Sequence, residues 1–160
     1  MIKAVTLDAY NTMLTLINPY KVMQGELAAS GCGIPLEAVA VAFREAMEFY
    51  KTRHLAADTY ENLEILRKQG ADLIFQSLED QGFLCGIAES ERSGILDRSI
   101  RFQVFDDVIP ALEQLKDMPV KLGVVSNWDC TLPDILNDFG LLHYFDVVSV
   151  SAIEGVQKPD

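Results

Sequence analysis

Three short apolar runs, separated by segments with helical spacing, constrain the fold of this chain most. Residues 3–7, 120–125 and 145–150 are rich in valine, leucine and other apolar side chains. Runs that are apolar on both faces are typical of buried strands in parallel sheets. Helical spacing over 108–116 precedes the second run, and helical spacing over 131–139 separates the second run from the third. Because parallel strands need crossover connections, this order predicts an α/β fold with a Rossmann-like parallel sheet.

The longest stretch of helical spacing lies between the first apolar run and the others. From residue 18 to about residue 101, apolar residues recur at intervals of three and four, and no run there predicts a strand. The pattern is interrupted at three segments: 30–35, 54–59 and 81–86. We therefore expect a four-helix insertion over 17–101, carried by a sheet domain built from 1–16 and 102–160.

The charge balance argues against a nucleic-acid partner. The 160 residues include 13 Lys and Arg against 24 Asp and Glu, a formal net charge of −11, and no basic run. Phosphate-backbone binding needs clustered cations, so we expect no nucleic-acid partner. No apolar run reaches the roughly 18 residues of a membrane span, and the first residues do not resemble a signal peptide. We therefore expect a cytoplasmic protein that does not contact membranes.

The cysteine pattern predicts free thiols. Cys32, Cys85 and Cys130 are an odd number at wide spacings, and no two of them form a CxxC pair. Such a pattern indicates neither a disulfide framework nor a zinc site. Because free cysteine is among the most buried residue types, we expect all three to be buried or half-buried thiols.

Polar residues follow the apolar runs, where ligands bind in doubly wound sheets. Asp8 follows the first run, and Ser126 and Asn127 follow the second. Lys158 comes shortly after the third. Each residue alone has a structural explanation as a cap, a turn or a solvated side chain. Together, a carboxylate nucleophile, a hydroxyl, an amide and an ammonium are what transfer of a phosphoryl group to an aspartate requires.

These residues and their neighbours resemble the motifs of the haloacid dehalogenase superfamily. The matching segments are VTLDAYNTML at 5–14, GVVSN at 123–127 and KPD at 158–160. SNWD at 126–129 is similar to the subgroup that inserts a helical cap after the first motif. The expected four-helix insertion falls where that cap would be.

The resemblance implies a hydrolase with defined residue roles. Asp8 would be the nucleophile that forms an aspartyl-phosphate, and Ser126 would bind the transferring group. Lys158 would stabilise Asp8 and the incoming anion. Contacts to the nucleophile loop and the substrate would come from three further residues: Tyr10, Thr12 and Asn127. Mg²⁺, the implied cofactor, would be held by Asp8 and the backbone carbonyl of Tyr10. The implied reaction is hydrolysis of a small phosphate ester.

Position 10 departs from the phosphatase pattern. The family's phosphatases carry a second Asp there as the acid and base of the reaction, and a phenol, which ordinarily titrates near a pKa of about 10, is a poor base near neutrality. The family's dehalogenases look like Asp-Ala-Tyr-x-Thr, so a 2-haloacid dehalogenase with Asp8 as nucleophile is the alternative. It would need a cap arginine for the substrate, for which Arg44 and Arg53 are candidates. Asn11 replaces a usual glycine, which is tolerable because Asn accepts a positive φ.

The third motif ends the given sequence. In the family, a helix and two strands follow, and the first of these strands brings an acidic loop that completes the Mg²⁺ site. Asp106 and Asp107 are poor replacements because they precede a helix and suit its N-terminus. We expect part of a longer chain. The alternative is a natural short form that covers its exposed strand edge as a homo-oligomer and has lost Mg²⁺-dependent catalysis. A separate hypothesis is a catalytically silent binding protein whose cap recruits a partner.

Overall fold

The computed structural model describes residues 2–159, which form two compact units. The sheet unit comprises three segments: 2–15, 54–63 and 102–159. The helical unit comprises two segments: 16–53 and 64–101.

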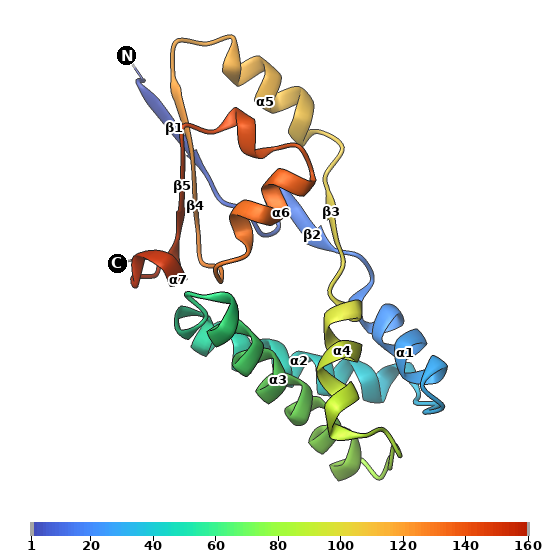
Figure 1. The fold of residues 1–160 in the computed structure, drawn as a ribbon. Helices are drawn as coiled ribbons and strands as arrows, with labels where there is room; N and C mark the ends of the chain where they lie inside the picture. The colour runs from blue at the N-terminus through green and yellow to red at the C-terminus, as the bar shows by residue number, and fades with distance from the viewer. Residues whose placement is uncertain (1, 160) are drawn as a thin grey trace. The chain divides into compact units, whose positions relative to one another are not determined.

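The sheet unit is built on a three-stranded parallel sheet in the order β1-β4-β5 (Figure 1). β1 (Ala4–Leu7) pairs in parallel with β4 (Lys121–Ser126), which pairs in parallel with β5 (Val147–Val150). The register places Leu7 opposite Val124 and Ser126 opposite Val150. The carboxyl ends of all three strands therefore lie at one edge of the sheet. The predicted α/β class with a parallel sheet is confirmed.

Short helices and a second, smaller sheet complete this unit. The helices are α5 (Val108–Lys116), α6 (Leu132–Asp138) and α7 (Ser151–Glu154), with 3₁₀ turns η1 (His54–Ala56) and η2 (Leu142–Tyr144). β2 (Leu14–Leu16) pairs with β3 (Phe102–Val104). The apolar core includes Val124, Leu132 and Leu136, none of which is exposed. Periodicity did not predict β2 and β3, because three residues are too few for alternation to be read.

The helical unit contains the four expected helices. They are α1 (Pro19–Ala29), α2 (Leu36–Arg53), α3 (Tyr60–Asp80) and α4 (Glu89–Ser99), of which α3 begins in the sheet unit. Its core is an apolar cluster that includes Val39, Phe43 and Leu78. No helix among residues 2–159 combines the length and the hydropathy needed to cross a bilayer.

Residues 54–63 group with the sheet, although the expected helical insertion, 17–101, includes them. The reason is hydrogen bonding to distant parts of the chain: the backbone N–H of Cys130 donates to the carbonyl of Ala57 at 2.9 Å. The side chains of His54 and Ser151 also meet within this unit, 3.0 Å apart. Such contacts join residues about 70 to 100 positions apart, so hydrophobic spacing carries no trace of them.

The expectation of three free thiols is wrong for two of the cysteines. Cys32 and Cys85 form a disulfide within the helical unit, with Cα atoms 5.4 Å apart and a sequence separation of 53. Cys32 lies between α1 and α2, and Cys85 lies between α3 and α4. The pairing depends on how the helices bring these two loops together, which cysteine spacing does not encode. Cys130 keeps its thiol and is half-buried.

Candidate active site

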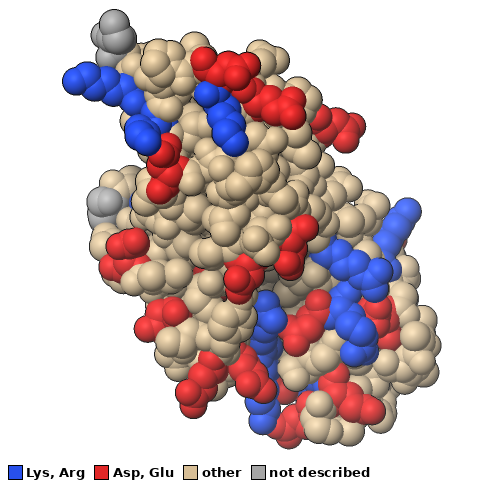
Figure 2. Space-filling model, turned by 45° about the horizontal axis from the view of Figure 1, so that its top comes forward, with Lys and Arg blue, Asp and Glu red and all other residues tan. Residues whose placement is uncertain are grey.

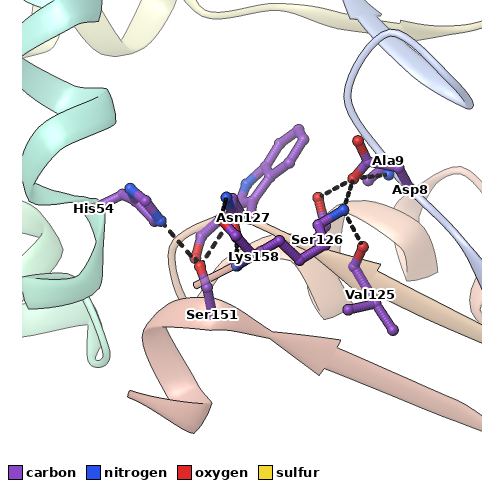
Figure 3. A network of polar contacts seen from close by, with 9 residues as sticks. Asp8, Ala9, His54, Val125, Ser126, Asn127, Ser151 and Lys158 are labelled. Carbon is purple, nitrogen blue, oxygen red and sulfur yellow. Dashed lines mark hydrogen bonds and ion pairs between the residues drawn. The ribbon is translucent and has the colours of Figure 1, made fainter. Parts of the chain in front are cut away.

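Asp8, Ser126 and Lys158 come together at the carboxyl ends of β1 and β4 (Figure 3). Asp8 directly follows the last residue of β1, and Ser126 is the last residue of β4. The Ser126 hydroxyl donates to Oδ1 of Asp8 at 2.9 Å. The Lys158 ammonium lies 3.0 Å from the same oxygen. Asp8 and Ser126 are close because the parallel register brings the carboxyl ends of neighbouring strands to one edge of the sheet.

The Asp8 carboxylate is bound asymmetrically. Oδ1 receives the Ser126 hydroxyl, the Lys158 ammonium and the backbone N–H of Ala9, the last at 2.9 Å. Oδ2 receives no hydrogen bond or ion pair from residues 2–159, and the side chain is 45% exposed. One oxygen is thus held by donors while the other remains open to an incoming electrophile.

A tight turn directly follows Asp8. The carbonyl of Ala9, which is fully buried, accepts hydrogen bonds from three backbone N–H groups, those of Thr12, Met13 and Leu14, at 3.3, 2.9 and 3.0 Å. Asn11 has a φ of 56°, as expected for a residue in a usual glycine position. The turn therefore fixes the peptide after Asp8 without needing a glycine.

Tyr10 and Thr12 lie in the same turn but do not hydrogen-bond the Asp8 carboxylate. The Tyr10 side chain is 39% exposed, and its ring meets the ring of Trp128 edge to face with centroids 6.2 Å apart. Thr12 is exposed, and its hydroxyl has no hydrogen-bond partner within residues 2–159. Both groups are available to a ligand approaching Asp8.

Asn127 holds the backbone of Lys158 through both polar atoms of its side chain. Its Nδ2 donates to the Lys158 carbonyl at 3.1 Å, and its Oδ1 accepts from the Lys158 N–H at 2.8 Å. The Lys158 ammonium also donates to the carbonyl of Val125 at 2.8 Å. Lys158 is therefore fixed at its backbone and at its ammonium, and the Asn127 amide faces the chain instead of a ligand.

The donors around Asp8 do not form a complete magnesium site. No group of three His, Cys, Asp or Glu residues within 2–159 is arranged to hold a metal ion. Mg²⁺ prefers near-octahedral oxygen ligands, commonly one or two carboxylates with waters and phosphate. Oδ2 of Asp8 is one such ligand, and the Tyr10 carbonyl, expected as a second, adds no charge. The Lys158 ammonium already neutralises part of the Asp8 charge.

The other residues singled out in the sequence have ordinary surface roles. Asp106 and Asp107 are exposed, and Asp107 occupies the N-cap position of α5 without a side-chain capping bond. In the helical unit, Arg44 is exposed on α2, and the guanidinium of Arg53 lies 4.3 Å from the centroid of the Phe49 ring. None of these four shows a feature of a binding site.

A buried polar cluster beside Ser126 and Asn127 escaped the sequence analysis. Ser151, at the start of α7, contacts His54 and both backbone polar groups of Trp128 (Figure 3). All three side chains are buried, with exposed fractions of 4–5%. Ser151 follows β5, so the strand-end rule that selected Ser126 points to it as well. No local signal points to His54.

A second polar contact links the start of α3 to α6. The Tyr60 hydroxyl donates to the Asp134 carboxylate, and this hydrogen bond is the main reason that the pKa of Tyr60 rises to about 12. The thiol of Cys130 and the carboxylate of Asp129 contribute in the same direction. Tyr60 is 59% exposed and stays protonated at neutral pH, so it is a poor candidate for a base.

Comparison with known proteins gives a consistent family match. A family model described as a hydrolase, haloacid dehalogenase-like hydrolase, matches residues 2–160. The haloacid dehalogenase-like hydrolase domain-containing protein 3 of Bos taurus is 30% identical over 167 residues, and that of Homo sapiens is 27% identical over the same length. Both matches cover 99% of this chain, and the chain spans 65% of the length of each relative.

Solved structures share the fold at low sequence identity. An L-2-haloacid dehalogenase from Xanthobacter autotrophicus superposes with a TM-score of 0.61 at 24% identity, covering 99% of this chain and 60% of that one. A magnesium-bound putative HAD-hydrolase from Bacillus subtilis superposes with a TM-score of 0.66 at 16% identity, covering 99% and 68%. At these identities the likeness concerns the fold alone.

Proposed function

The chain belongs to the haloacid dehalogenase-like hydrolases, and we propose that it carries the nucleophile of a phosphatase for small phosphate esters. The observation that carries the proposal is the asymmetric binding of Asp8. Three donors hold Oδ1, which fixes the carboxylate and directs Oδ2 toward the substrate. Covalent catalysis by a carboxylate needs an ionised, oriented oxygen of this kind.

Two successive displacements at phosphorus account for the hydrolysis. Oδ2 of Asp8 attacks the phosphorus, the bond to the ester oxygen breaks, and the alcohol leaves with the electron pair and takes a proton from solvent. Water then attacks the phosphorus of the aspartyl-phosphate, which releases phosphate and restores the carboxylate. Lys158 and Ser126 offset the repulsion between the Asp8 carboxylate and the incoming anion. No step is assigned to Mg²⁺, because the described donors do not complete its coordination.

Three further assignments belong to the same proposal. Tyr10 and Thr12 are proposed to meet the substrate, since both are exposed beside Asp8. The four helices of the helical unit are proposed as the cap that selects it, as lids commonly do. A small molecule is the proposed partner in preference to nucleic acid. On the face shown in Figure 2, basic side chains are interspersed with acidic ones and form no continuous patch.

The test is turnover of p-nitrophenyl phosphate by the full-length protein, with and without added Mg²⁺. We expect Asp8→Asn to lower kcat by at least about 10³-fold, because the amide is a poor nucleophile. The matched control is Asp106→Asn, which changes an exposed carboxylate next to α5 and should leave kcat unchanged. Turnover that survives Asp8→Asn contradicts the assignment of the nucleophile.

Tyr10 favours a second candidate, a 2-haloacid dehalogenase, because displacing a halide requires no acid at this position. Oδ2 of Asp8 would attack the halogen-bearing carbon, the halide would leave with the bonding electrons, and water would hydrolyse the resulting ester. Halide release from 2-chloropropionate without added metal supports this reaction. Single turnover in heavy-oxygen water separates the two: the label enters Asp8 in the dehalogenase and phosphate in the phosphatase. If the full-length protein turns over neither substrate, a binding role is favoured.

A further inference from the structure

We infer that His54 and Ser151 are positioning residues that fix the loop carrying Ser126 and Asn127. The inference rests on the proposed function, because that loop supplies the Ser126 hydroxyl to Asp8 and the Asn127 amide to Lys158. Neither His54 nor Ser151 is placed against the reacting atoms. They act on the reaction through the backbone of Trp128, the next residue of the loop.

Ser151 ties the loop after β4 to the start of α7. The Trp128 N–H donates to the Ser151 hydroxyl at 3.0 Å, and this hydroxyl lies 3.2 Å from the Trp128 carbonyl, to which it donates. The N–H of Ala152 donates to the same carbonyl at 3.2 Å. Trp128 is therefore held at both polar groups of its peptide backbone by the first two residues of α7.

His54 completes the bonding of this hydroxyl. A serine hydroxyl donates one hydrogen bond and accepts two. With its proton directed to the Trp128 carbonyl, its two acceptor positions are filled by the Trp128 N–H and by Nε2–H of His54, which lies 3.0 Å away. Only a histidine protonated on Nε2 satisfies all three contacts. In the tautomer protonated on Nδ1, Nε2 would accept the Ser151 proton, and the hydrogen bond from Ser151 to the Trp128 carbonyl would be lost.

Burial distinguishes this pair from a catalytic serine and histidine. His54 is 4% exposed and Ser151 is 5% exposed, so a substrate does not reach the Ser151 hydroxyl. The hydroxyl is also occupied by three partners. A buried and fully bonded hydroxyl holds structure rigidly and is unsuited to nucleophilic attack.

The same contacts reach both partners of Asp8. Ser126 and Asn127 directly precede Trp128, so a shift of the Trp128 backbone moves the hydroxyl donor and the clamp on Lys158 together. Lys158 is also connected through α7, which begins at Ser151 and ends at Glu154. The segment that follows η1 adds a second tie to this loop through the 2.9 Å bond from the Cys130 N–H to the Ala57 carbonyl.

The test compares His54→Gln with His54→Leu. Glutamine keeps a donor near the place of Nε2, whereas leucine fills the space without one. We expect His54→Leu to lower kcat for the proposed substrate by about tenfold or more with KM within about threefold, and His54→Gln to retain kcat within about threefold. The matched control is His143→Leu, an exposed histidine of the same unit, which should leave kcat unchanged. Equal loss of kcat in the Gln and Leu variants, or none in Leu, overturns the inference.

Two spectroscopic measurements are independent of turnover. Nitrogen-15 NMR of the histidine side chain should show the proton on Nε2 of His54 in the wild-type protein. The Trp128 amide should exchange at least about tenfold faster in Ser151→Ala. A proton on Nδ1 alone, or unchanged exchange, overturns the inference even if the Leu variant fails to fold. If the wild-type protein turns over no substrate while both signatures are present, the proposed function fails and the structural contact stands.

Discussion

The strand-end site and the helical unit are held together by different forces. Around Asp8, half-exposed side chains are placed by hydrogen bonds and one ion pair, with 45% of Asp8 and 41% of Lys158 exposed. In the helical unit, side chains such as Leu27, Val39 and Leu78 are fully buried in an apolar cluster. An exposed polar contact contributes about 1 kcal/mol or less to stability, whereas truncating a buried leucine costs about 2–5 kcal/mol.

On the proposed function, turnover and folding stability depend on separate residues. Changes at the site should alter turnover with little change in the free energy of unfolding. Changes in the helical unit should alter the free energy of unfolding first.

After the loss of the Asp8 carboxylate itself, removal of the ammonium beside it should have the largest effect on turnover. Lys158→Gln is expected to lower kcat by about 10²–10³-fold, because Oδ1 of Asp8 and the incoming anion lose their cation. The free energy of unfolding should change by less than about 1 kcal/mol, since the ion pair is half-exposed. Lys121→Gln, which removes an exposed lysine paired with Asp146, is the matched control. Steady-state kinetics that show equal kcat for the two variants would refute the role of Lys158.

Leu78→Ala should have the largest effect on stability. Leu78 is fully buried in the helical unit, so the substitution removes apolar contacts and leaves a cavity, and we expect a loss of about 2–5 kcal/mol. The measurement is urea denaturation followed by circular dichroism. Leu84→Ala is the control, because Leu84 is 85% exposed and should change the free energy by less than about 0.5 kcal/mol. Similar losses for both variants would show that the cluster around Leu78 is not the core.

Reducing the Cys32–Cys85 disulfide should destabilise the helical unit by about 2–4 kcal/mol, because the bond closes a long loop in the unfolded chain. The comparison is the urea midpoint of the oxidised protein with and without a reductant. The double variant Cys32→Ser, Cys85→Ser should match the reduced protein and become insensitive to the reductant. Cys130→Ser should keep the full sensitivity. If the wild-type midpoint does not respond to the reductant, these cysteines form no bond in solution.

The smallest effect concerns a charged group of the helical unit. Hydrogen bonding from Arg98 is the main cause that holds the pKa of Glu26 below its ordinary value, and the charge of Arg101 adds to it. A lowered folded-state pKa contributes stability above the unfolded pKa, which is lost as the pH falls through the folded value. The expected contribution is less than about 1 kcal/mol because the arginines are exposed.

The measurement for Glu26 is the urea midpoint of wild type and Glu26→Gln between pH 7 and pH 3. The variant should be slightly less stable at pH 7, and the difference should vanish toward pH 3. A difference that persists or grows as the pH falls would show that Glu26 acts through packing and not through charge.

Much of the fold could be predicted because its elements are long and periodic. The helix over 108–116 has the bounds of α5, and β4 and α6 differ from their expected bounds by one residue at each end. The four helices of the insertion follow from their apolar spacing. The exceptions are short or depend on distant contacts: β2 and β3 have three residues each, and residues 54–63 join the sheet through hydrogen bonds to the loop after β4 and to Ser151.

The candidate site was predictable to the extent that it obeys strand topology. Asp8, Ser126 and Lys158 follow strands, and parallel pairing brings strand ends together. The role of Asn127 was not predictable, because a side-chain amide after a strand can hydrogen-bond either a ligand or the protein backbone. His54 was missed for a related reason: its partner lies 97 residues away. Residue type indicates which interactions a side chain can make, and only the fold determines which neighbour it makes them with.

The Asn127 clamp has a consequence for how position 158 can change. The two hydrogen bonds of Asn127 hold the backbone N–H and carbonyl of Lys158 and do not involve its side chain. The placement of the residue is thereby separated from the chemical group that it presents to Asp8. A different side chain at this position would be placed by the same two backbone bonds, so the charge that faces Asp8 can be altered while the surrounding structure stays intact.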